Sequence, residues 1–109
     1  MNELKTKYEY GVVLENNPVD KKIAEVLDKV NDNLNKTYGH FLDLSDGDDE
    51  YIDCYVEMDY KMAYHDQDIL KDIKKVCKDL GYKCNIDDYP NVDMDWSLTV
   101  TYEVCIYLN

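Results

Sequence analysis

The chain has 109 residues, 45% of them hydrophobic, which fits one globular domain spanning residues 1–109 and excludes a disordered chain. Its formal net charge is −12, from 24 acidic residues against 12 basic residues, all of them lysine. A surface of this charge repels nucleic acid and anionic membranes, so we expect a basic protein as the direct partner, with no direct contact to either.

The N-terminal residues and the cysteines indicate the compartment. Residues 1–10 lack the apolar core of a signal peptide, and no apolar run reaches membrane-spanning length. We therefore expect a cytoplasmic protein, and the abundance of Lys, Asn and Asp favours a bacterial host with AT-rich coding sequences. In that compartment the four cysteines are expected to be free thiols.

The first forty residues predict a strand followed by a helix. Apolar residues alternate along Leu4–Leu14, as in a strand with one buried face. Asn17 and Pro18 suit the N-cap and first position of a helix, and Gly39 suits its C-terminal end. Its inward stripe is Val19, Ile23, Val26, Leu27, Val30 and Leu34.

A hairpin and a second helix are predicted next. A short strand at His40–Leu44 leads through an acidic turn over residues 45–50 into the long strand Tyr51–Ala63. Even positions of that strand are apolar, and its odd positions are mostly acidic or tyrosine. The second helix begins near His65 and Asp66 and ends at Gly81; Ile69, Ile73, Val76 and Leu80 belong to its apolar stripe. Lysines at 71, 74, 75 and 78 mark its outer face.

The C-terminal part predicts two more strands. One includes Tyr82, Cys84 and Ile86, and the other runs from Val92 to Leu108 after a turn at residues 89–91. The inward side of the last strand is expected to hold Trp96, Leu98, Val100, Tyr102, Val104 and Ile106.

The element order is β-α-β-β-α-β with an extra C-terminal strand, which resembles the ferredoxin-like fold. The resemblance implies an α+β domain whose antiparallel sheet has both helices on one face and water on the other. Acidity is concentrated on the strands: residues 43–59 hold eight acidic residues and residues 84–109 hold five, with no lysine in either segment. We therefore expect the uncovered face of the sheet to be acidic.

This acidic face and its hairpin turn are the predicted partner-binding site. Short aspartate side chains hold charge close to the backbone and alternate with tyrosine, a frequent interface residue. Such carboxylates can imitate a row of phosphates; the alternative is a surface that only confers solubility. The predicted site residues are Asp46, Asp48, Asp49, Glu50, Asp53, Tyr55, Glu57, Asp59, Asp93 and Asp95.

Motifs for catalysis, metals and cofactors are missing from the sequence. Read as an EF-hand with Gly47 at position six, the acidic turn would put Leu42 where a carboxylate belongs. The cysteines at 54, 77, 84 and 105 form no C-x-x-C pair, and no nucleotide-binding or hydrolase motif is present. We predict a protein that is not an enzyme and needs no metal or cofactor.

In size, acidity and lack of motifs, the chain is similar to small phage-encoded anti-defence inhibitors, anti-CRISPR proteins among them. The resemblance implies a nucleic-acid mimic that fills the basic groove of a nuclease, effector complex or DNA-binding protein. Two alternatives stay open: an immunity protein or antitoxin that neutralises a basic toxin, and a small-molecule-binding domain. A homodimer formed through an edge strand also stays open.

Overall fold

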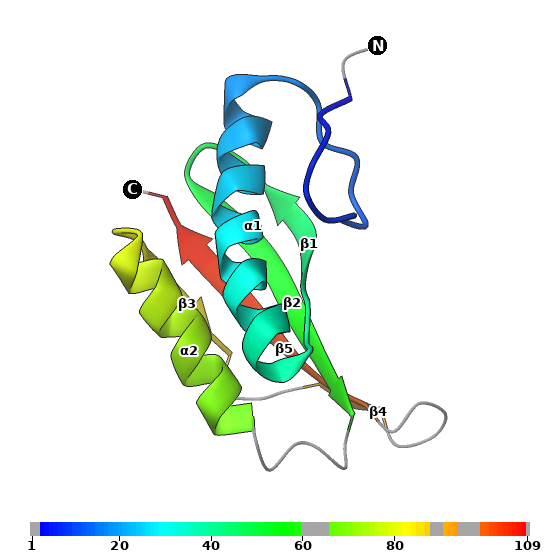
Figure 1. The fold of residues 1–109 in the computed structure, drawn as a ribbon, viewed down its shortest axis with the longest axis vertical. Coiled ribbons are helices and arrows are strands. Elements are labelled where there is room, and N and C mark those ends of the chain that lie inside the picture. The colour runs from blue at the N-terminus through cyan, green and yellow to red at the C-terminus, as the bar shows by residue number, and fades with distance from the viewer. Residues whose placement is uncertain (1–2, 60–65, 88–90, 94–98, 109) are drawn as a thin grey trace.

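The protein is an α+β domain in which two helices cover one face of an antiparallel sheet (Figure 1). The computed structural model describes residues 3–59, 66–87, 91–93 and 99–108. The elements in chain order are α1 (Pro18–Tyr38), β1 (Leu42–Gly47), β2 (Tyr51–Asp59), α2 (Asp66–Asp79), β3 (Lys83–Ile86), β4 (Asn91–Asp93) and β5 (Thr99–Tyr107). The predicted class and the placement of both helices on one face are confirmed.

The strands follow the order β1-β2-β5-β3, and every pair is antiparallel. β5 pairs with β2 along its whole length, from Tyr51↔Tyr107 to Asp59↔Thr99. β2 pairs along one edge of β5. The short strands β3 and β4 both pair with the opposite edge of β5. β5, the last strand in sequence, is therefore central in the sheet.

The predicted first strand, Leu4–Leu14, is wrong. Residues 3–15 form a loop closed by a bridge between Glu3 and Glu15 and by a 2.8 Å bond from the Leu4 amide to the Leu14 carbonyl. Both sides of β2 are already taken by β1 and β5, so this segment has no place beside it. Because no sheet strand precedes α1 among the described residues, the ferredoxin-like order is not confirmed.

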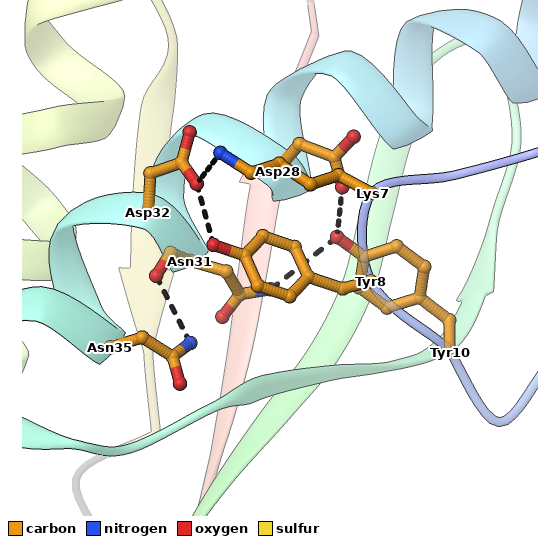
Figure 2. Close-up of polar contacts among 7 residues, drawn as sticks. All are labelled: Lys7, Tyr8, Tyr10, Asp28, Asn31, Asp32 and Asn35. Carbon is orange, nitrogen blue, oxygen red and sulfur yellow. Dashed lines mark hydrogen bonds and ion pairs between the residues drawn. The ribbon is translucent and has the colours of Figure 1, made fainter.

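The N-terminal loop instead packs beside α1 (Figure 2). The Tyr10 hydroxyl donates to Asp28 of α1 at 2.7 Å, and Lys7 and the Tyr8 hydroxyl both contact Asp32 one turn later. The rings of Tyr8 and Tyr10 also lie 5.7 and 5.6 Å from the ring of Phe41, which precedes β1. The alternating tyrosines of the N-terminal loop therefore pack against α1 and Phe41, and the loop adds no strand to the sheet.

Two other strand boundaries need correction. The predicted strand Val92–Leu108 is two strands, since β4 and β5 pair with each other through Val92↔Val100. Trp96 and Leu98 lie outside the described residues, as does the predicted continuation of β2 over residues 60–63. β1 also continues past Leu44 to Gly47, with a bulge between Leu44 and Asp46.

The core lies between the helices and the even positions of β2 and β5. Buried there are Ile52, Cys54, Val56, Met58, Val100, Tyr102, Val104 and Ile106. From the helices come Ile23, Val26, Leu27, Val30, Leu34, Ile69, Ile73 and Cys77, while Val76 and Leu80 are partly buried. Val19 was expected to be buried but is 37% exposed in the first turn of α1.

The ends of α1 follow the predicted capping. The Asn17 side chain accepts a 2.8 Å hydrogen bond from the Asp20 amide, and Gly39 ends the helix at φ 71°, where a side chain would be strained. The described part of the chain contains no helix with the length and apolar character needed to cross a bilayer.

Candidate functional site

The candidate site is the sheet surface opposite the helices, which we call the open face. Because side chains alternate along a strand, the odd positions of β2 and β5 lie on this surface while the even positions are buried. Along β2 the open face presents, in order, Asp53, Tyr55, Glu57 and Asp59. All four belong to the predicted site, and the structure places them in one row.

Acidic side chains from the neighbouring strands widen this row. Tyr55 lies between Asp43 of β1 and Glu103 of β5, and Asp53 lies beside Asp46 of β1. Strands β1, β2 and β5 therefore place six described carboxylates on the open face: Asp43, Asp46, Asp53, Glu57, Asp59 and Glu103. The segment from Asp53 to Asp59 spans about 20 Å and carries three of these charges on β2 itself. With the three on β1 and β5, the three strands together hold about one charge per 3.4 Å of length.

Tyr55 has a structural role as well as a surface position. Its hydroxyl donates to Asp43 Oδ2 at 3.0 Å, and this bond raises the pKa of Tyr55 above its usual value. The other oxygen of Asp43 accepts from the amides of Gly11, at 3.1 Å, and Leu44, at 2.9 Å. Asp43 thus joins the N-terminal loop, β1 and β2, and the Tyr55 hydroxyl is bonded within the protein.

The acidic turn between β1 and β2 is shaped by Asp48. Its Oδ1 accepts from the Glu50 amide at 2.8 Å and from the Tyr51 amide at 3.1 Å. The Glu50 carbonyl accepts from the Leu108 amide at 2.8 Å, which ties the turn to the end of β5. The Asp48 side chain therefore stabilises the turn, whereas the exposed Asp49 and Glu50 side chains add charge beyond the end of the open face.

For two predicted site residues, Asp93 and Asp95, the structure gives the backbone position of the first only. In the backbone register Asp93 of β4 pairs with Thr99, the partner of Asp59, so all three share one row across the sheet. Nothing further is described for the Asp93 side chain, and Asp95 lies outside the described residues.

Asp43, Asp87 and Glu103 were not predicted as site residues. Glu103 lies across the strands from Tyr55, and its carbonyl accepts a 3.0 Å bond from the Asp87 amide. Alternation identifies Glu103 as outward-facing, but only the pairing register shows that it neighbours Tyr55.

The open face has a hollow on each side of Tyr55. One, of about 350 Å³, is lined by Asp53, Asn85, Asp87, Glu103 and Cys105, with Ile86 and Val104. The other, of about 330 Å³, is lined by Gly39, His40, Phe41, Asp43, Tyr55 and Glu57. Both contain more than one carboxylate, so each provides a negatively charged recess for a cationic side chain.

The helices on the opposite side are neutral overall, because α1 and α2 each carry four lysines and four acidic residues. Lys71, Lys75 and Lys78 are exposed on α2, and the ion pairs Lys7–Asp32 and Lys29–Glu25 both involve α1. The excess of acidic residues therefore lies on the sheet, whose described strands carry one lysine, Lys83 of β3.

The cysteines and acidic residues form no metal site in the described part of the chain. All four thiols are free; Cys54 and Cys77 are buried, and Cys84 and Cys105 are partly exposed. Burial raises the pKa of Cys54 well above its usual value, and interaction with Cys84 raises that of Cys77. These two thiols are therefore un-ionised at neutral pH and serve as small core residues.

Comparisons with protein-family models, curated proteins and solved structures found no match to this chain. What the open face can bind follows from its own chemistry, which is a rigid row of carboxylates with two acidic recesses. Such a surface suits cationic groups held at matching intervals on another macromolecule.

Proposed function

We propose that the protein is a small inhibitor that binds a basic, nucleic-acid-binding protein through the open face and excludes that protein's nucleic acid. The supporting observation is the charge density. Six carboxylates on three adjacent strands, within about 20 Å, carry about as much charge per unit length as one nucleic-acid strand. A groove of lysine and arginine side chains that fits such a strand also fits this face.

The construction of the face adds to this argument. Strands hold short aspartate side chains more rigidly than a disordered acidic tail would, so less conformational entropy is lost on binding. The exposed lysines of α2 belong to a helix that covers the opposite face of the sheet, where they interfere little with an approaching basic groove. The overall negative charge also accelerates encounter with a basic partner at low salt.

The biological setting we propose is the cytoplasm of a bacterial host, with a nuclease or anti-phage effector as the partner. An immunity protein or antitoxin would use the same face against a basic toxin, and the identity of the partner separates these roles. For the fold, we propose a rearranged ferredoxin-like sheet in which β5 takes the central place of the first strand of that fold.

A displacement assay tests the proposal. A fluorescent single-stranded oligonucleotide is bound to each member of a panel of purified basic nucleases and DNA-binding proteins, and the protein is titrated in. We expect it to release the oligonucleotide from its partner, and failure with every member of a broad panel would count against the mimicry. The test variant combines Asp53→Asn, Glu57→Gln and Glu103→Gln, which keep side-chain size and remove three charges from the open face.

The matched control removes the same number of charges from the helices. Glu25→Gln, Asp68→Asn and Asp79→Asn are exposed changes on α1 and α2, behind the sheet. Each exposed charge pair contributes roughly 0.2–1 kcal/mol, so the test variant is expected to displace about tenfold less well. The control variant is expected to displace the oligonucleotide as well as the parent does. An equal loss of displacement in both variants would indicate that binding depends on net charge alone.

A further inference from the structure

Two exposed tyrosines lie together at the turn end of the open face. Tyr51 of β2 and Tyr107 of β5 are paired in the register and are 36% and 39% exposed. Tyr55, on the same face, is partly buried and bonded to Asp43. Tyr51 and Tyr107 therefore offer more aromatic surface to a partner than Tyr55 does.

Carboxylates surround the Tyr51 side of this pair. The charges of Asp48, Asp46 and Asp53, in that order of effect, raise the pKa of Tyr51. Lys83 lies on the far side, paired with Tyr107 in the register. A cationic group from a partner is therefore attracted toward Tyr51, where the negative potential is strongest at this end.

We infer that Tyr51 and Tyr107 bind arginine side chains of the basic partner in preference to lysine side chains. The inference rests on the proposed function and specifies the partner's chemistry. A guanidinium is planar and weakly hydrated, so it stacks on a tyrosine ring while its edge donates to a carboxylate. An ammonium is strongly hydrated and has no flat face to stack. Asp53, two residues from Tyr51 on the same side of β2, and Asp46, the cross-strand partner of Asp53, supply the acceptors.

The test compares two peptide probes of equal charge, an arginine octapeptide and a lysine octapeptide, bound to the 109-residue protein. Titration calorimetry at several salt concentrations gives the arginine-to-lysine affinity ratio for the parent. Tyr51→Leu with Tyr107→Leu removes both rings, and Tyr51→Phe with Tyr107→Phe keeps them. We expect the affinity ratio to fall about three- to tenfold in the Leu variant and to be retained in the Phe variant.

The charge variant of the open face separates this inference from the proposed function. Removing the rings should leave the salt dependence of lysine-peptide binding unchanged, because no charge is lost. An undiminished arginine preference in a folded Leu variant would overturn the inference while leaving the proposed function standing. If neither peptide binds the parent, or the Asp53, Glu57 and Glu103 variant binds both as well as the parent, the proposed function fails and the inference with it.

Discussion

Asn31 of α1 is hydrogen-bonded to both backbone groups of Leu42, the first residue of edge strand β1. Its Nδ2 donates to the Leu42 carbonyl at 2.9 Å, and its Oδ1 accepts from the Leu42 amide at 2.7 Å. Both residues are fully buried, and Asn31 also lies in the polar cluster between α1 and the N-terminal loop (Figure 2). The side chain replaces the bonds that another strand would make, so this edge is closed to further pairing at Leu42.

Asn31→Leu is expected to destabilise the protein by about 2–4 kcal/mol, because it leaves a buried amide and a buried carbonyl without partners. Urea unfolding measures the change. Asn35→Ala is the control, since Asn35 is exposed and donates only to the Asn31 carbonyl; it should cost less than about 1 kcal/mol. Equal unfolding free energies for the Leu variant and the parent would show that the edge does not depend on Asn31.

Met58→Asp tests the burial pattern of β2. Met58 is 1% exposed beneath the helices, so a carboxylate there has no water and should cost several kcal/mol. The neighbouring change Glu57→Gln lies on the open face and should stay within about 0.5 kcal/mol of the parent. Circular dichroism and thermal melting compare the two, and a Met58→Asp variant as stable as the parent would refute the assigned register.

Stability is expected to fall at alkaline pH. The folded state raises the pKa of Cys54 through burial and that of Tyr10 through burial and its bond to Asp28. The unfolded chain releases these protons near pH 8.5 and 10, while the folded protein keeps them. The proton-binding difference therefore favours unfolding above about pH 8.5, by up to about 1.4 kcal/mol per pH unit for each group.

Cys54→Ala isolates the thiol contribution to that pH dependence. The variant is less stable overall because it leaves a cavity, but its unfolding free energy should decline less steeply between pH 8.5 and 9.5. Denaturant unfolding at fixed pH values gives both slopes. Parallel slopes for variant and parent would mean that Cys54 is not responsible for the alkaline loss.

Thiol reactivity should follow burial. A chromogenic disulfide reagent is expected to leave Cys54 and Cys77 unmodified in the folded protein and to count four thiols after denaturation. Added chelator should leave the melting temperature unchanged, because the described residues form no metal site. A large drop in melting temperature with chelator would instead indicate that metal stabilises the fold.

The burial pattern of β2 was predictable because alternation is a local property of the chain. The same alternation in Leu4–Leu14 led to a wrong strand, since pairing depends on competition for sheet edges. β5 takes one side of β2 along nine residues, and Asn31 closes β1 at Leu42. Neither effect can be read from the period of a single segment.

The site was predictable to the same extent. Asp53, Glu57 and Asp59 follow from their odd positions in β2, and the structure places them on one face. Asp43 and Glu103 could not be assigned as neighbours of Tyr55 without the cross-strand register. Asp48 is predicted to bind a partner, and its bonds to the Glu50 and Tyr51 amides add a role in the turn that the sequence did not reveal.

The central claim is that the open face binds a basic groove as a nucleic-acid strand does, and salt dependence tests it most directly. Affinity for a partner found by displacement is measured from 50 to 300 mM NaCl for the parent, the Asp53, Glu57 and Glu103 variant and the helix control. We predict steep weakening with salt for the parent and the control, and a clearly shallower dependence for the open-face variant. The same slope and affinity in all three proteins would contradict the account.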